Sequence, residues 1–280
     1  MIYIALTIIF STTILVTFRL LSSSKANTRH AIIVNYLAAS VISAIAFELS
    51  PDTINAPWFW PTIAEGVLFY VVFMAMAKTA QINGVATAGI ASKMSVVIPI
   101  SVGIFWLNET ATTFKILGIF AGFFAVLLVA GRGANFNQWK WPLISFLGIG
   151  LIDTSLKLFQ VWGVSDAEFP EFISSVFGTA FLVGVAHHFT FSKWAMNVQS
   201  ISIGAFLGLC NFATLFCFMT ALSLPNWESS IVFPITNFGI VALATLLAVV
   251  LFHEQLTTRV RCGLGCAFLS ICLLYISGSS

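Results

Sequence analysis

The sequence predicts an all-α integral membrane protein of ten transmembrane helices. Of its 280 residues, 59% are hydrophobic and 8% are charged, and the mean hydropathy is +1.01. Soluble domains carry roughly 25% charged residues, so this chain could not cover its own surface in water. The apolar residues also fall into ten runs of about 20, the length that spans about 30 Å of hydrocarbon.

The ten predicted helices follow one another with short connections, none of which could hold a separate soluble domain. In the first run the basic residues follow the apolar stretch, the reverse of a signal peptide, so we expect a retained helix. All eight tryptophans lie near predicted helix ends, where indole rings prefer the headgroup level. The predicted spans are residues 2–21, 30–49, 58–77, 84–107, 112–130, 141–162, 169–189, 199–222, 228–252 and 257–277.

The charges in the connections predict the orientation. Nine basic residues fall in the odd-numbered connections, whereas Lys115 is the basic residue of the even-numbered ones, which collect the acidic residues. The positive-inside rule then places the odd connections in the cytoplasm and both termini outside. The nine are Arg19, Lys25, Arg29, Lys78, Arg132, Lys140, Lys193, Arg259 and Arg261.

The two halves of the chain form an internal repeat, residues 1–135 and 136–280. A shift of 145 residues places Glu109-x-x-Thr112-Thr113-x4-Gly118 on Glu254-x-x-Thr257-Thr258-x4-Gly263 without a gap. Each half would hold five helices, an odd number, so the halves would insert with opposite orientations. Inverted repeats of this kind are typical of secondary transporters, whose substrate site lies at the repeat interface.

These features resemble the drug/metabolite transporter superfamily, and more narrowly its EamA-type members. The resemblance rests on two five-helix halves, each with an acidic residue after its fourth helix and a glycine-bearing fifth. It covers essentially the whole chain. It implies transport of amino acids or other small metabolites across a bacterial cytoplasmic membrane, through a central cavity lined mainly by helices 1, 3, 4, 6, 8 and 9.

Two sets of residues near helix ends have structural interpretations. The threonines of the repeated motif can cap the helix that follows, while Glu109 and Glu254 would favour its positive N-terminal end. The spacings Gly118-x3-Gly122 and Gly204-x3-Gly208 permit close contact between helices.

Ionisable side chains inside the bilayer are costly and are therefore candidates for function. Lys93 lies about nine residues into the fourth predicted helix, and Asp153 about twelve residues into the sixth. Both helices enter from the predicted cytoplasmic side, so the two side chains reach similar depths. Lys157 follows Asp153 by one turn on the same face. Glu65 is a weaker candidate, which we expect to lie nearer the outer surface and to be hydrated.

Polar residues on the helices with prolines, and Asn211 in the eighth predicted helix, where lipid would not readily tolerate a polar group, extend this set. Pro99 and Pro234 are expected to interrupt the fourth and ninth helices and to free backbone carbonyls for a cavity. The repeat also superposes Ser92-Lys93 on Asn237-Phe238. The candidate substrate-binding or coupling residues are Lys93, Asp153, Lys157, Asn211, Asn237 and Ser92.

Three roles remain open for the charged residues. Asp153 could form a purely structural ion pair with Lys93 or Lys157, Lys93 could contact an anionic substrate, or the group could act in coupling or gating. The corresponding functions are a secondary transporter of amino-acid-like or organic-acid-like metabolites, an exchanger of sugar phosphates or nucleotide sugars, and a membrane scaffold or lipid-handling protein. The expected partners are a small-molecule substrate, membrane lipids and a coupling ion or counter-substrate.

Other classes of function have no support in the sequence. The nucleotide-binding pattern G-x4-G-K-[ST], the zinc pattern H-E-x-x-H and paired-cysteine metal motifs are missing from the sequence. All five cysteines fall within apolar runs of the second half. We therefore expect no enzymatic activity, cofactor or metal. A nucleic-acid partner is not expected either, because the sequence has no basic cluster.

Overall fold

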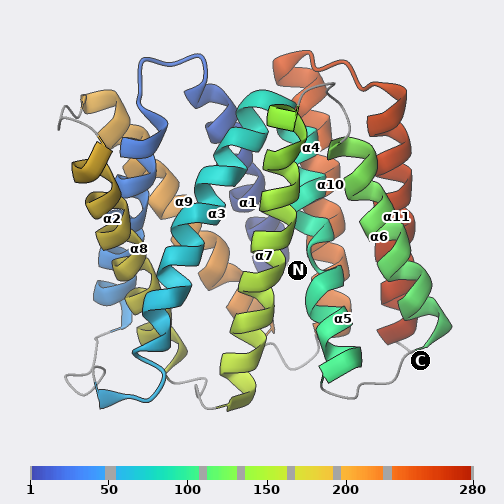
Figure 1. Ribbon diagram of the computed structural model, residues 1–280, viewed down its shortest axis with the longest axis horizontal. Helices are drawn as coiled ribbons and strands as arrows, with labels where there is room; N and C mark the ends of the chain where they lie inside the picture. The colour runs from blue at the N-terminus through green and yellow to red at the C-terminus, as the bar shows by residue number, and fades with distance from the viewer. Residues whose placement is uncertain are drawn as a thin grey trace.

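The computed structural model describes residues 2–47, 55–106, 112–130, 136–162, 168–191, 197–222 and 229–278. In this part of the chain the regular structure is helical, and the helices stand side by side in one bundle (Figure 1). The helices are α1 (Ile2–Leu21), α2 (Thr28–Phe47), α3 (Pro61–Asn83), α4 (Val85–Met94), α5 (Val97–Trp106), α6 (Thr113–Ala130), α7 (Phe136–Trp162), α8 (Phe169–Phe191), α9 (Val198–Leu222), α10 (Ser229–Phe252) and α11 (Thr258–Gly278).

The prediction of an all-α membrane protein is confirmed. Eight stretches of the described chain are long and apolar enough to cross a membrane, and the residues 85–106 of α4 and α5 count as one of them. The apolar part of α6 is shorter, at Thr113–Leu128, and α7 does not meet the same measure. Both helices coincide with predicted spans. Because neither meets the measure, the count of ten transmembrane helices remains a prediction.

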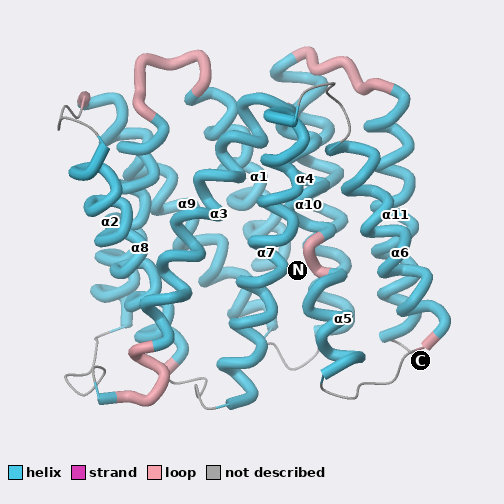
Figure 2. Tube along the Cα trace, in the orientation of Figure 1, coloured by secondary structure: helices cyan, strands magenta, loops and turns pink. Residues whose placement is uncertain are grey.

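The predicted fourth span is interrupted, as its proline suggested. The chain turns at Ser95 and Val96 between α4 and α5, and the Ile98 amide donates to the Ser95 carbonyl at 2.9 Å (Figure 2, pink segment between the two helices). Pro99 has no amide hydrogen, and its ring would clash with the carbonyl four residues earlier in a continuous helix. That carbonyl belongs to Ser95, which explains where the break falls.

The expected interruption at Pro234 was wrong. Helix α10 runs without a break from Ser229 to Phe252. Pro234 stands within its first two turns, where little of the i-to-i−4 hydrogen-bond ladder precedes it. A proline deep in a helix, as Pro99 would be in the predicted fourth span, disrupts that ladder far more.

Packing between helices places α7 beside the broken span. Helix α7 packs against α3 on one side and against α4 and α5 on another. Glycines on α7 allow this approach, since a Cβ on Gly148 would collide with Val72 of α3 and one on Gly150 would collide with Ile98 of α5. Elsewhere α2 packs on α8 and α9, α1 on α9 and α10, α4 on α10, and α6 on α11.

The outward faces of the bundle are apolar. Phe120, Phe124 and Leu246, for example, are largely exposed. Lipid is the solvent that such a surface requires, in agreement with the composition.

The Gly-x3-Gly contacts are confirmed for α9. A Cβ on Gly204 would lie 2.6 Å from the Ala31 carbonyl oxygen, and one on Gly208 would lie 2.6 Å from the Asn35 carbonyl oxygen. These atoms belong to the backbone of α2, which cannot move aside as a side-chain tip can. The two glycines therefore set the closest approach of α2 and α9.

We expect Gly208→Ala to lower the thermal stability of the purified protein, because the added methyl would separate α2 from α9. Overpacking of this kind costs about 1–3 kcal/mol. Gly265→Ala is the matched control, since a Cβ there meets nothing within 4 Å. Melting temperatures in the same detergent check the prediction, and equal values for the two variants would contradict it.

Candidate functional site

Lys93 and Asp153 share one region of the interior. Lys93 is half-buried near the end of α4, six residues before Pro99, and its ammonium interacts electrostatically with Asp153 of α7. Asp153 also interacts with Ser95, at the break between α4 and α5, whose hydroxyl donates to the Ser92 carbonyl at 2.6 Å. The two charges influence one another but do not form a direct ion pair.

Glu65 of α3 is the third ionisable group of this region. Its side chain is buried, at 4% exposure, so the expectation that it is hydrated was wrong. Its Oε2 lies 2.8 Å from the Ser155 hydroxyl of α7, and it interacts electrostatically with Asp153. The close packing of α3 on α7 explains the burial, which the position of Glu65 along α3 does not reveal. We call Lys93, Asp153, Glu65 and the serines Ser95 and Ser155 the charged cluster.

The remaining candidates lie in different surroundings. The Ser92 hydroxyl is buried and donates to the Gly89 carbonyl of its own helix at 3.1 Å. Asn211 of α9 donates to Asn35 of α2 at 3.5 Å, which places it at the α2–α9 contact. Asn237 is half-buried on α10. Lys157 lies on α7 one turn after Asp153, but its side chain is outside the described residues.

Two members of the charged cluster were not among the sequence candidates. Ser95 could have been found from Pro99, because it is the residue four positions earlier whose carbonyl a proline frees. Ser155 gives no such signal. Its partner Glu65 is 90 residues away along the chain, and only the packing of α3 against α7 joins them.

A second polar network lies where α3 meets α4. The Glu254 side chain, 8% exposed, accepts the Val85 amide at 3.0 Å, and its Oε1 lies 3.9 Å from Nε of Arg19. Arg19 in turn donates to the Gln81 carbonyl. Gly84, with a φ of 95°, leaves the space for the carboxylate, because a Cβ there would collide with it.

This network corrects the expectation for Glu254. The carboxylate lies at the N-terminus of α4, in the other half of the chain, and not at the helix that follows it. Its interaction with a helix N-terminus is of the expected kind, but with a different helix. Glu109 lies outside the described residues. Caps by Thr112 and Thr257 are confirmed, since Thr112 accepts from the Lys115 amide at 3.3 Å and Thr257 from the Val260 amide at 3.5 Å, whereas Thr110 lies outside the described residues.

Histidines join α2 to α8 at a third polar contact. His30 Nε2 lies 3.2 Å from His188 Nδ1, and the neighbouring His187 Nδ1 lies 2.9 Å from the Tyr70 hydroxyl of α3. Among the residues that the structure describes, no group of three histidine, cysteine or acidic side chains could hold a metal ion.

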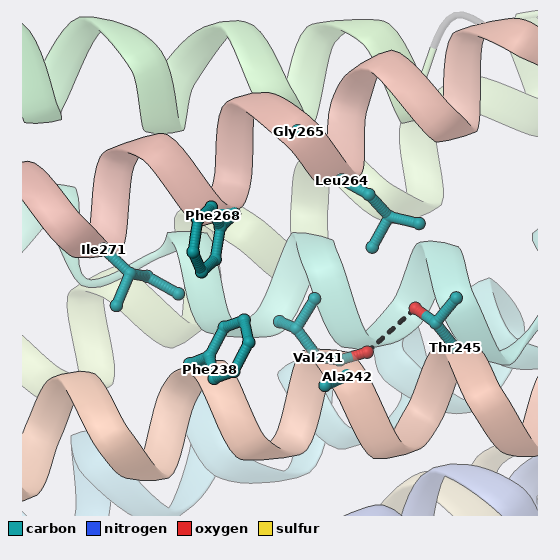
Figure 3. A pocket seen from close by; sticks show the side chains of 8 residues that line it. All are labelled: Phe238, Val241, Ala242, Thr245, Leu264, Gly265, Phe268 and Ile271. Atoms are coloured by element: carbon teal, nitrogen blue, oxygen red, sulfur yellow. Dashed lines mark hydrogen bonds between the residues drawn. The ribbon is translucent and has the colours of Figure 1, made fainter.

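An apolar groove of about 350 Å³ lies between α10 and α11, away from these polar groups (Figure 3). The hydroxyl of Thr245 is occupied within its own helix, where it donates to the Val241 carbonyl at 2.8 Å. The groove therefore offers little polar recognition. It is lined by Phe238, Val241, Ala242, Thr245, Leu264, Gly265, Phe268 and Ile271.

Comparison with known proteins supports the fold without naming a function. No family model matches the chain. The chain is 26% identical to an uncharacterized protein of Haemophilus influenzae over 273 residues, covering 90% of this chain and 91% of that protein. It also resembles a protein of known crystal structure, with a TM-score of 0.60 and 10% identity over 98% of this chain and 99% of the other. At that identity the likeness concerns the fold alone.

We expect the charges of Lys93 and Asp153 to be energetically coupled. Lys93→Ala and Asp153→Ala should each lower the melting temperature, because each leaves a buried charge less well compensated. The loss of stability in the variant with both changes should be smaller than the sum of the two single losses, by about 0.5–3 kcal/mol.

Thermal unfolding of the three variants in one detergent measures this coupling. Lys25→Ala is the control for loss of a positive charge, since Lys25 is exposed outside the helices. Strictly additive losses would contradict the coupling of Lys93 and Asp153.

Proposed function

We propose that this protein is a secondary transporter that moves a small amino-acid-like or organic-acid-like metabolite across a bacterial cytoplasmic membrane by alternating access. The observation that carries the proposal is the charged cluster beside the broken α4–α5 span. Charged side chains within apolar spans are costly and usually mark the path of a substrate or ion. Interrupted helices line the sites of many secondary transporters for a similar reason.

The packing of the helices supports an inverted repeat of two five-helix halves. Exchanging the halves pairs α1, α2, α3, the α4–α5 span and α6 with α7, α8, α9, α10 and α11. Under this exchange the contacts of α3 with α7 and α8 correspond to those of α9 with α1 and α2. The contacts of α2 with α8, of α4 with α10 and of α6 with α11 correspond to themselves. This pattern agrees with the resemblance to EamA-type transporters.

The halves differ in how tightly equivalent helices pack, which is expected of one state of an alternating-access cycle. Helices α1, α3 and α4 contact one another, whereas among the described residues their counterparts α7, α9 and α10 contact one another far less. The contacts of Glu254 with Val85 and Arg19 hold the tighter group together at one end. The distribution of basic residues predicts that this end is cytoplasmic.

The chemistry of Lys93 favours an anionic group on the substrate. An ammonium in a low-dielectric interior attracts a carboxylate strongly. A sugar phosphate or nucleotide sugar would call for a second base, and Lys157 is the candidate for it. A scaffold or lipid-handling protein would need no polar interior of this kind.

Uptake and exchange of a mixture of labelled amino acids and organic acids in proteoliposomes test the proposal. Wild-type protein should move at least one of them, Lys93→Ala should abolish that movement, and Lys93→Arg should retain part of it, because the guanidinium keeps the charge but displaces it. Lys25→Ala is the control and should transport like the wild type.

Two results would contradict this assignment. A folded Lys93→Ala protein with unchanged substrate affinity would remove Lys93 from the site. Transport of phosphorylated sugars in place of carboxylates, lost in Lys157→Ala, would favour the exchanger.

A further inference from the structure

Glu65 occupies an environment suited to a bound proton. The side chain is 4% exposed, and its Oε1 is buried without a hydrogen-bond partner. Its other oxygen, Oε2, faces the Ser155 hydroxyl at 2.8 Å. A carboxylate so placed retains little of the solvation that stabilises its charge in water.

The geometry at Ser155 requires one more hydrogen than the serine itself supplies. Its hydroxyl oxygen lies 2.8 Å from Oε2 of Glu65 and also 2.9 Å from the Ile152 carbonyl oxygen. One hydroxyl hydrogen satisfies one of these acceptors at a time. With a proton on Glu65, the carboxylic acid donates to Ser155 and Ser155 donates to Ile152, so both short contacts become hydrogen bonds.

The charges around Glu65 point the same way. Asp153 of α7 interacts with it electrostatically, and Lys93 of α4 interacts with Asp153. From α2, Tyr36 donates its hydroxyl to the Phe69 carbonyl, and α8 presents Thr179 and Ala180 beside Gly66. Helix α1 carries Arg19 in its last turn. Arg19 contacts Gln81, which lies about 24 Å along α3 from Glu65.

The described part of the cluster therefore holds one ammonium and two carboxylates. If both carboxylates were ionised, these described groups would carry a net negative charge in a low-dielectric interior, which is costly. A proton removes that charge and occupies no volume. An alkylammonium or a hydrated sodium ion would need space beside Oε1, which is closed to solvent.

We infer that Glu65 is the proton-binding site that couples transport to the proton gradient, with Ser155 as its hydrogen-bond partner and Asp153 as the second carboxylate. This inference rests on the proposed transport function. When the carboxylate of a substrate binds Lys93, Asp153 loses part of its counter-charge. Proton binding at Glu65 then becomes more favourable, and by linkage the proton favours substrate binding equally.

Infrared difference spectra of the full-length protein between acid and alkaline buffers test the proton site without any substrate. The wild type should show the carbonyl stretch of a protonated, buried carboxylic acid. That band should be lost in Glu65→Gln and be retained in the control Glu171→Gln, a change at the start of α8. A band that persists in Glu65→Gln would overturn the inference.

Transport of the same amino-acid and organic-acid mixture tests the coupling. A pH gradient, acid outside the vesicles, should drive accumulation by the wild type and by the control Glu171→Gln, while Glu65→Gln should lose that accumulation. Accumulation that depends on a sodium gradient, or that survives in Glu65→Gln, would overturn the coupling role and leave the transporter assignment standing. Loss of the infrared band in Glu65→Gln without any transport by the wild type would support the proton site and count against the transporter assignment.

Discussion

The compensation of the buried Lys93 charge is the constraint on which the interior of this protein depends. A positive charge within an apolar bundle is stable only beside negative or polar groups, and Asp153 supplies the negative charge. Asp153 can reach this position because α7 packs closely on its neighbours. Gly148 and Gly150 make that approach possible, since either Cβ would collide with α3 or α5.

The same packing brings the broken span and the third ionisable group together. Pro99 ends the hydrogen-bond ladder of α4, so that Ser95 lies at a turn beside Asp153. Helix α3 covers the other side of α7, where Glu65 meets Ser155. The site thus joins elements from both halves of the chain, as a substrate site at a repeat interface would.

The sequence was sufficient for features that depend on neighbouring residues. Apolar runs located the helices, Pro99 located the break, and the Gly-x3-Gly spacing indicated the close contact of α9. Contacts between distant segments were harder. Glu254 binds the α4 N-terminus across 169 residues of sequence. The burial of Glu65 depends on which face of α3 meets α7, and an almost uniformly apolar helix carries no pattern that reveals this face.

The central claim is that Lys93 lies in a site open to water from each side of the membrane in turn. Labelling of Lys93→Cys by a membrane-impermeant maleimide tests it most directly, in a variant whose five native cysteines are replaced. Right-side-out and inside-out vesicles expose the two faces separately. The account predicts labelling in both preparations. Labelling in neither, or from one face under every condition, would contradict alternating access at this site.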